Sequence, residues 1–493
     1  MRVGGRGRWS VAALLSISMC GQADTAELET VTVTARRRAE DPLSVPIAMS
    51  VLDAGRLEAK GAVNLQQMGG MLPSLYYNSA NPRNTAYTIR GLGSNTLSIS
   101  AANDGIEPGV GFYVDEVYHA RPASAAFDLT DIERVEVLRG PQGTLYGKNT
   151  TAGAINVVTR RPSFEPAAEA QISVGSFDLL QAKASMTGPL ARGLAGRLAA
   201  LYTRRDGTLR NLRTGQDLNA LGNLALRGQL LFEPTEASSL RLSADLADLR
   251  SACCTQVFLR VGQSLRSPSR QFPALAAGLG YTPPSTDAFD RLTDIDAPLR
   301  IDTRQGGVSL HADFQVQRGT LTSVTAWRRW RWDVANDRDY TGLPIQLVQR
   351  IPSLQDQYSQ ELRFASDRRG RFDEVVGLYA FTQRISAQPI SGYGPAAAYW
   401  LLNPANFSVP IPRDLLDGYG QRGDSRFTMR SYAAFGELGW QLADGLRATL
   451  GLRYTYEDKH GSYVTEVAGG PSLAALPPST VAELTRARLS KIG

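Results

Sequence analysis

The chain has 493 residues, of which 43% are hydrophobic and 20% are charged, and its formal net charge at pH 7 is +6. This length suits two or three ordinary domains or one very large β architecture. The positive charge is mild and spread along the chain, so nucleic acid is not an expected partner. Three His and three Cys without ligand-like spacing give no zinc motif.

The N-terminus has the pattern of a secretory signal peptide. Three arginines within the first eight residues precede the apolar run VAALLSISM at 11–19, and Gly21 and Ala23 have the spacing of a cleavage site. We expect cleavage after Ala23. No apolar run of 18 or more residues follows. An exported chain of this kind is either soluble or a β-barrel, because barrel strands also satisfy their backbone groups inside a bilayer.

From residue 42 to 162 the sequence predicts a compact α+β domain. The segment RLEAKGAVNLQQMGGML at 56–72 has helical character that glycines interrupt. Strand-like runs separated by polar or glycine-rich turns follow it. These runs are AYTIRG (86–91), GVGFYVDEVY (109–118), ERVEVLRG (133–140) and GAINVVTRR (153–161).

The stretch RGPQGTLYGKNTTAG at 139–153 raises the question of a phosphate-binding loop. The pattern G-x-x-x-x-G-K-[ST] would require glycine where Gln142 stands, and Asn149 replaces the Ser or Thr. The following run is strand-like, so no helix N-terminus would face an anion. We therefore interpret the glycines as turn formers and as points of close backbone packing.

From about residue 167 onward, segments alternate with a period of two, as strands with two different faces do. In LRATLGLRYTYED at 446–458, Leu, Ala and Tyr occupy one face and mainly Arg, Thr and Glu occupy the other. The expected strands are 167–175, 178–187, 195–206, 221–232, 238–248, 305–316, 320–333, 355–366, 372–384, 428–441 and 445–458, and a twelfth is expected to begin in 485–493.

The predicted connections alternate between short and long. A β-sandwich gives no reason for this alternation, whereas an outer-membrane barrel has short periplasmic turns and long outer loops. The short ones are 188–194, 233–237, 317–319, 367–371 and 442–444, and the long ones are 207–220, 249–304, 334–354, 385–427 and 459–484. The sequence thus predicts an antiparallel transmembrane β-barrel at 163–493.

Size arguments relate the two regions. A domain of this length has a radius of about 18 Å, whereas twelve strands enclose a radius of about 12 Å and twenty-two strands about 22 Å. Only the larger barrel would hold the N-terminal domain. The sequence therefore predicts a 22-stranded parent of ~800 residues, of which about half the barrel is present here. The alternative is a complete barrel of eleven or twelve strands beside a soluble domain.

Three stretches carry a family resemblance: ETVTVTARR (29–37), YTIRGLG (87–93) with GVGFYVDEVY, and DIERVEVLRGPQGTLYGKNTTAGAINVVTRRP (131–162). A further stretch, SYAAFGELGWQLADGLRATLGLRYTYEDK (431–459), is similar to a barrel hairpin of the same family. Together they resemble the TonB-dependent outer-membrane receptors. The family's final strand, which ends in an aromatic residue, is absent.

The resemblance implies a domain order and two sets of site residues. Residues 1–23 are the signal peptide, 24–41 the TonB box and linker, 42–162 the plug, and 163–493 a partial barrel. The box would pair with TonB by β-augmentation. The expected TonB-binding residues are Glu29, Thr30, Val31, Thr32, Val33, Thr34 and Ala35. The expected plug-motif residues are Arg90, Gly91, Arg134, Glu136, Arg139, Gly140, Gly143 and Gly147.

The resemblance also implies energy-coupled uptake of a scarce ligand across the bacterial outer membrane, without enzymatic chemistry and with no cofactor held by dedicated protein ligands. A ferric siderophore is the favoured ligand; cobalamin and an oligosaccharide remain open, as do a passive channel and a soluble exported enzyme or binder. Expected partners are TonB with its inner-membrane proton-motive motor, outer-membrane lipid and lipopolysaccharide. A monomer is expected.

Charge and aromatic content suggest where the ligand binds. The long loop 249–304 is rich in Arg, which would attract an anionic ligand, and loop 385–427 is rich in aromatic rings. The candidate ligand-binding residues are Arg250, Arg260, Arg266, Tyr393 and Trp400. Plug charges, including Arg90, Glu116, Glu133, Arg134, Glu136 and Arg139, are expected to pair with Arg447, Arg453 and Glu457 of the barrel wall. Cys253 and Cys254 are adjacent, so they form a vicinal ring or stay free.

Overall fold

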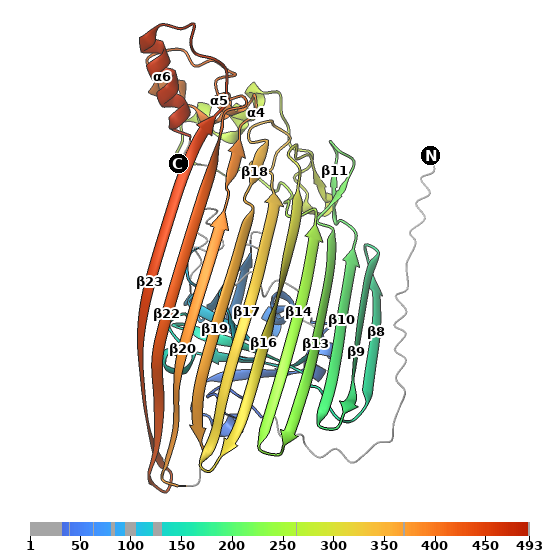
Figure 1. Cartoon of the computed structure of the whole chain (residues 1–493). Helices are drawn as coiled ribbons and strands as arrows, with labels where there is room; N and C mark the ends of the chain where they lie inside the picture. Colours follow the sequence, from blue (N-terminus) through green and yellow to red (C-terminus); the bar gives the residue numbers. More distant parts are fainter. Residues whose placement is uncertain are drawn as a thin grey trace, which may run out of the picture.

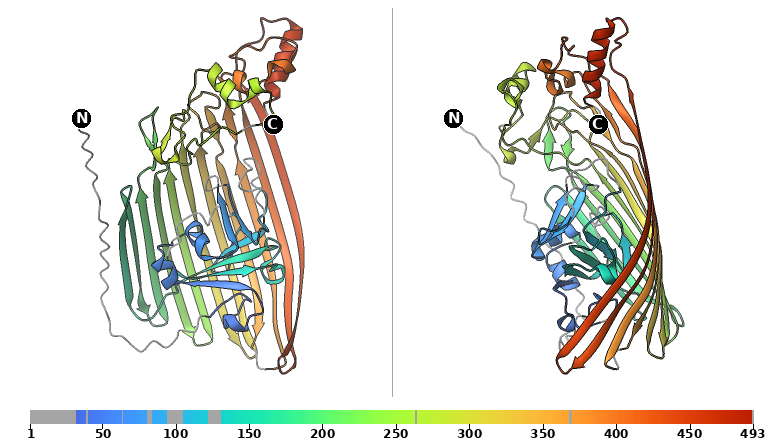
Figure 2. Two further views of the ribbon diagram at one scale, coloured as in Figure 1. Left: turned by 180° about the vertical axis from the view of Figure 1, so that it is seen from behind. Right: turned by 90° about the vertical axis from the view of Figure 1, so that its left-hand side faces the viewer.

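The structure is a computed structural model that describes residues 32–38, 40–62, 64–79, 84–93, 105–121, 131–262, 264–367 and 370–491. A large curved antiparallel sheet, the wall, forms one layer, and the smaller plug domain lies on its concave side (Figure 1, Figure 2). The expected signal peptide and residues 29–31 of the expected TonB-binding segment lie outside the described residues.

The plug is built around a five-stranded sheet with the order β1-β6-β7-β4-β5, in which only β4 and β7 run parallel. A separate hairpin, β2–β3, packs beside it. The elements are η1 Pro42–Ser44, β1 Met49–Asp53, α1 Ala54–Ala59, α2 Leu65–Met68, η2 Gly69–Met71, β2 Leu75–Ser79, β3 Thr85–Ile89, β4 Val110–Val114, β5 Val117–His119, β6 Ile132–Arg139, α3 Gly143–Tyr146 and β7 Gly153–Thr159.

Local sequence explains these short elements. Asp53 caps α1 by accepting a hydrogen bond from the backbone N–H of Arg56 at 2.8 Å. The run at 109–118, which we expected to be one strand, is instead a hairpin: Asp115 and Glu116 have φ of 46° and 67° and form its turn. The first element after Lys148 is strand β7, as expected, and no helix begins between this lysine and β7.

The wall contains thirteen strands. Two of them, β18 Val348–Arg350 and β21 Ile390–Gly392, have three residues each, and the other eleven correspond to the eleven expected strands. Neighbours along the chain pair antiparallel. The long strands are β8 Ala167–Gly175, β9 Leu179–Ala191, β10 Leu194–Arg205, β13 Leu221–Thr235, β14 Ser238–Ser251, β16 Arg300–Val316, β17 Gly319–Ala335, β19 Ser353–Ser366, β20 Phe372–Ala387, β22 Gly420–Ala443 and β23 Leu446–Ala468.

The two faces of each strand separate as the period of two predicts. On β23, Leu450 and Leu452 point outward and are 73% and 77% exposed. The intervening Gly451 faces the plug, where an added Cβ would lie 2.9 Å from Oγ1 of Thr144. The outward face is therefore apolar and the inward face follows the surface of the plug.

Short turns lie at one end of the wall and long connections at the other (Figure 1). The expected twelfth strand in 485–493 is wrong, because α6 Pro478–Leu489 occupies this region. Pro477 and Pro478 start the helix, and Leu484 and Ala487 bury one side of it against the outer loops. Within the described residues β8 and β23 do not pair, so the wall is open rather than a closed eleven- or twelve-stranded barrel.

The long connections fold into a cluster of short elements above the wall. Buried Leu343, Ile345, Leu402, Leu415 and Leu416 form its apolar core. None of the helices in the described ranges is both long and apolar enough to span a membrane. The elements are β11 Leu209–Asn211, β12 Asp217–Leu218, η5 Pro268–Arg270, α4 Phe272–Gly278, η6 Ala288–Asp290, β15 Leu292–Thr293, α5 Ala397–Leu401 and η7 Pro404–Asn406.

Candidate functional site

The N-terminal segment 32–38 is buried where the plug meets the wall. It makes a tight turn in which the N–H of Val33 donates to the carbonyl of Glu40 at 2.8 Å and the N–H of Arg37 donates to that of Thr34 at 2.9 Å. Val33 and Ala35 are almost completely buried, and Thr32 is exposed. The C-terminal half of the expected TonB-binding segment is therefore packed inside the protein in this conformation.

Glu136 on β6 holds this segment to the plug. Its Oε1 accepts hydrogen bonds from the N–H of Thr34 at 3.0 Å and from Nε of Arg134 at 2.8 Å. Its Oε2 accepts one from Nδ2 of Asn156 at 3.1 Å, and its side chain is fully buried. The N–H of Thr34, which β-augmentation would use, therefore already donates to a carboxylate. Hydrogen bonds to charged acceptors are among the strong ones.

Three consecutive arginines fasten the segment to three different strands of the wall. Arg36 lies 2.5 Å from Glu437 of β22, and Arg38 lies 2.7 Å from Asp373 of β20. Between them, Arg37 lies 3.5 Å from Glu361 of β19. Arg36 and Arg37 are almost completely buried. We call residues 36–38 the arginine latch. The sequence analysis missed it, although three adjacent arginines behind an expected binding segment are a visible signal.

Arg37 is also enclosed by aromatic rings of the plug. Its guanidinium lies 4.5 Å from the ring centre of Tyr146 and 5.6 Å from that of Tyr113. Burial disfavours its charge, but Glu361 and Glu116 outweigh this cost and raise the pKa of Arg37 above its ordinary value. The guanidinium therefore stays charged and needs both carboxylates.

Glu116 connects the plug turn to the wall chiefly through the guanidinium of Arg363 on β19. It lies 2.6 Å from Arg363 and 3.9 Å from Arg37, and Nε2 of His311 is 3.7 Å away. Burial would raise the pKa of Glu116, but Arg363, Arg37 and His311 lower it below its ordinary value. A second plug carboxylate, Asp115, pairs with Arg227 of β13. The plug turn is thus an ionic contact with the wall.

The expected plug–wall pairs were mostly wrong in their partners. Arg134 pairs within the plug with Glu133 and Glu136, and Arg139 donates to Oγ of Ser50 at 2.5 Å. Of the wall residues, Arg447 pairs with Asp373 of the same wall. Arg453 donates to the carbonyl of Thr144 at 3.4 Å. Glu457 does pair with the plug, through Lys148. Which charged residues pair with each other depends on the register of the strands, and the sequence alone does not reveal that register.

The plug-motif glycines and their neighbours lie in turns. Arg90 and Gly91 have φ of 54° and 76°, and the side chain of Arg90 is exposed. Gly140 and Gly147 both have φ of 89°, whereas Gly143 begins α3. An added Cβ at Gly147 would lie 3.3 Å from Nη2 of Arg453. Gly147 therefore lets the plug approach the wall, and Gly143 has no atom within 4 Å of such a Cβ.

The candidate ligand-binding residues are spread over the outer end of the wall. Arg250 lies on the outward face of β14, 3.0 Å from Asp248, and Arg260 and Arg266 are exposed in the following loop. Oη of Tyr393 donates to the carbonyl of Lys491 at 2.6 Å. The ring of Trp400 lies edge-on to Phe272, with 5.5 Å between centres. The two aromatic residues therefore pack the loop cluster, while the arginines are solvent-accessible.

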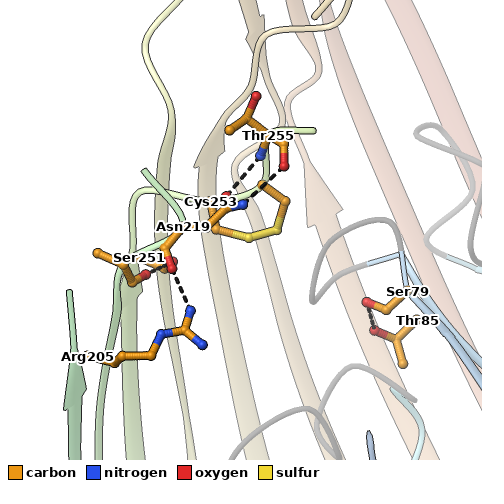
Figure 3. The surroundings of a disulfide bond; sticks show 9 residues. Ser79, Thr85, Arg205, Asn219, Ser251, Cys253 and Thr255 are labelled. Atoms are coloured by element: carbon orange, nitrogen blue, oxygen red, sulfur yellow. Dashed lines mark hydrogen bonds between the residues drawn. A yellow bond between two sulfur atoms is a disulfide. The ribbon is translucent and has the colours of Figure 1, made fainter. Parts of the chain in front are cut away.

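Cys253 and Cys254 form a disulfide at the base of the outer loops (Figure 3). Both cysteines are partly buried and pack against the cluster that contains Trp330 and Trp332 of β17. Nearby, Nδ2 of Asn219 donates to the carbonyl of Thr255 at 3.1 Å, and Oδ1 of Asn219 accepts from its N–H at 3.0 Å. This pair of hydrogen bonds fixes the chain next to the disulfide. Within the described ranges, no group of three His, Cys, Asp or Glu is arranged to hold a metal ion.

A plug held on the concave face of an antiparallel wall, with its N-terminal segment buried between the two, is the architecture of a gated outer-membrane receptor. The family model of the TonB-dependent Receptor Plug Domain matches residues 41–154. The model of the TonB dependent receptor-like β-barrel matches residues 257–479. The chain belongs to the TonB-dependent receptors, a family of outer-membrane transport receptors.

Individual relatives agree with this assignment. The pesticin receptor of Yersinia pestis is 26% identical over 452 residues, which cover 90% of this chain and 58% of the relative. The ferrioxamine B receptor of Salmonella typhimurium is 26% identical over 233 residues, which cover 45% of this chain and 31% of the relative. The chain thus spans less than two thirds of the length of these relatives.

Solved structures share the fold. The ferric yersiniabactin uptake receptor of Yersinia pestis superposes with a TM-score of 0.66 at 22% identity, covering 85% of this chain and 61% of that one. The ferripyoverdine receptor of the outer membrane of Pseudomonas aeruginosa gives a TM-score of 0.62 at 16% identity, covering 90% and 56%. The plug-and-wall fold expected from the sequence is therefore confirmed.

Proposed function

We propose that the protein takes up a ferric siderophore across the outer membrane, with energy delivered by TonB from an inner-membrane proton-motive motor. The observation that carries this proposal is the burial of Val33 and Ala35, together with the hydrogen bond from the N–H of Thr34 to Glu136. A segment that must pair with a periplasmic partner is held inside the protein, so its exposure requires a second state.

The contacts of the segment suggest how the two states differ. In the buried state, Glu136 accepts from the N–H of Thr34, and the arginine latch joins the wall at Glu437, Glu361 and Asp373. Ligand bound above the plug shifts the equilibrium only if it binds the released state more tightly. Once TonB has paired with the released segment, a pull on it acts first on the latch, because residues 36–38 are the next in the chain.

The ligand class rests on the names of the relatives and on charge. Relatives and structural neighbours are named for ferrioxamine B, ferric yersiniabactin and ferripyoverdine. The exposed Arg260 and Arg266 give the outer loop a positive field that favours an anionic ferric complex. Iron here is cargo within the ligand, so the protein needs no metal site of its own.

The test combines a growth screen with a variant of the expected TonB-binding segment. A deletion strain receives iron as one ferric siderophore at a time, and uptake of radiolabelled iron is measured after complementation. Thr30→Pro removes an N–H needed for strand pairing and should abolish uptake while surface binding of the complex remains. Thr25→Pro, upstream of the segment, is the matched control and should transport normally.

Two outcomes would contradict the proposal in different ways. Uptake at the normal rate by the Thr30→Pro variant would show that transport does not depend on strand pairing between this segment and TonB. A growth defect confined to cobalamin or an oligosaccharide would keep the coupling and replace the ligand class.

A further inference from the structure

The disulfide between Cys253 and Cys254 encloses too little chain to act as an ordinary cross-link. In the chain-entropy account, a disulfide stabilises the fold by restricting the unfolded chain, and the gain grows with the number of residues that it encloses. These two cysteines are one position apart in the sequence. They follow the end of β14 by two residues, at the start of the long connection to β16. The effect of this bond on the structure therefore comes from the contacts that its sulfur atoms make.

One residue anchors the chain on both sides of the disulfide. Asn219 lies in the turn between β12 and β13, and its N–H donates to the carbonyl of Ala252 at 2.8 Å. Its side chain makes the two hydrogen bonds to the backbone of Thr255 (Figure 3). Among the described residues, neither cysteine makes a hydrogen bond through its own backbone. Packing of the disulfide therefore holds the two residues between these anchors.

The surface on which the disulfide packs is a pair of tryptophans. The rings of Trp330 and Trp332 are stacked with 5.8 Å between centres, and the side chains are only 4% and 2% exposed. In the part of the chain that the structure describes, the indole N–H of each has no hydrogen-bond partner. A buried donor without a partner costs free energy, and water would pair with it once it became accessible. The cluster under the disulfide is therefore poised to open.

The same cluster touches the plug. Arg121 follows β5 by two residues and is buried, and its guanidinium lies 5.1 Å from the ring centre of Trp330. Trp330 thus lies between the plug and the base of the outer loop. A change in how the disulfide packs would reach both of these parts of the protein.

We propose that the pair Cys253–Cys254 is a thiol–disulfide exchange site, and that its oxidised form holds the base of the outer loop against the tryptophan pair. Both cysteines are partly exposed, so a low-molecular-weight thiol can reach their sulfur atoms. The inference concerns the outer loop alone and depends neither on the transported ligand nor on TonB.

The exchange takes place in two steps. The thiolate of a first reagent molecule attacks one sulfur, the bond between the cysteines breaks, and a mixed disulfide forms. A second thiolate attacks the mixed disulfide, and the reagent leaves as its own disulfide. Two electrons and two protons pass to the protein, which then carries two thiols, while two reagent thiols are oxidised. Without the bond between them, the two sulfur atoms no longer pack as one unit, so the segment 252–255 loosens.

The test uses the full chain purified from outer membranes, with reduced glutathione as the thiol. Free cysteines are trapped with a maleimide and located by peptide mass. Hydrogen exchange is measured at the amides of Asn219 and Thr255, because their N–H groups make two of the anchoring bonds. The variant Cys253→Ser with Cys254→Ser represents the reduced state. The matched control, Asn219→Gly, removes the side-chain bonds to Thr255 and suits the φ of 63° at this position, while the disulfide stays in place.

We expect glutathione to make both cysteines of the same chain reactive toward the maleimide. Exchange at the two amides should rise about tenfold, as the loss of a partly buried apolar contact predicts. Oxidised glutathione should reverse both effects. The double serine variant should exchange fast with or without glutathione. Asn219→Gly should exchange faster at Thr255 in both states and should still respond to glutathione at residue 219.

Three results would overturn the proposal. One is a disulfide that glutathione leaves intact in the folded protein but reduces in urea. Another is equal exchange at the two amides in the oxidised and reduced protein, which needs no variant to fold. The third is full maleimide labelling before any thiol is added, since the cysteines would then be free. A failure of siderophore uptake leaves each of these readouts untouched.

Discussion

The backbone N–H of Thr34 donates to Oε1 of Glu136 at 3.0 Å, and the two residues are 102 positions apart in the sequence. This bond joins the expected TonB-binding segment to the central strand pair of the plug. Because Glu136 is fully buried and also accepts from Arg134 and Asn156, its carboxylate has no solvent to replace a lost donor. Under the proposed function, Glu136 acts as a switchable contact, and its strength would set how readily the segment is released.

Weakening this acceptor should expose the segment without unfolding the plug. Glu136→Gln keeps the shape but removes the charge and turns one oxygen into a donor that faces other donors. We expect a cysteine placed at residue 34 to react with a membrane-impermeant maleimide at least about fivefold faster, since hydrogen bonds to charged groups contribute about 1.5–3 kcal/mol. Glu133→Gln is the matched control, because Glu133 pairs with the same Arg134 but does not touch Thr34. Equal reactivity in both variants would contradict the switch.

Arg37 and Arg38 of the arginine latch should differ in how strongly they hold the N-terminal segment to the wall. Arg37→Gln removes a buried cation from Glu361 and Glu116, and breaking a buried ion pair costs about 3–5 kcal/mol; we expect the lower end, because Arg363 still neutralises both carboxylates. Arg38→Gln should cost less, because Asp373 keeps Arg447 as a partner. The force needed to extract the N-terminal segment, measured by single-molecule pulling, should fall more for Arg37→Gln. The reverse order would contradict the assignment of Arg37 as the central contact.

Gly147 should tolerate no side chain, whereas Gly143 should. Gly147 has φ of 89° and ψ of −176°, a conformation almost exclusive to glycine, and its added Cβ would press on the guanidinium of Arg453. Gly147→Ala should cost about 1–3 kcal/mol of plug stability. Gly143→Ala has open space and should be neutral or slightly stabilising. Hydrogen exchange of the β7 amides measures plug stability in both variants. Equal protection in Gly147→Ala and Gly143→Ala would contradict this prediction.

The outer loops should lose stability as the pH rises toward neutrality. Burial, followed by the nearby Asp337 and Asp339, raises the pKa of Asp296 from its usual 3.8 to about 7. Between these values the folded loop binds a proton that the unfolded chain lacks, so loop stability falls as pH rises from about 4 to about 7. Asp296→Asn should weaken this dependence without abolishing it, because burial also raises the pKa of Asp339, to about 6. Asp444→Asn, in a short turn, should leave the dependence unchanged. Exchange rates of amides 294–297, corrected for their intrinsic pH dependence, test this.

Local sequence determined much of the fold. The period of two located all eleven long strands, and the alternation of connection lengths placed their turns at one end, because both patterns depend on residues close together in the chain. The glycine-rich stretch 139–153 and the segment at 29–37 likewise pointed to a plug and a binding segment. Where the local pattern was weak, as in 485–493, it misled: Ala, Glu, Leu and Arg formed a helix against the loops instead of a strand.

Only the tertiary structure decided which charges meet. Arg36 and Glu437 are 401 positions apart, and their contact exists because strand order and register bring β22 over the N-terminal segment. The same holds for Glu116, because Arg363, which lies 2.6 Å away, belongs to β19 of the wall. Alternation is a property of one strand, whereas an ion pair is a property of two strands and their register, and that register is set by packing over the whole chain.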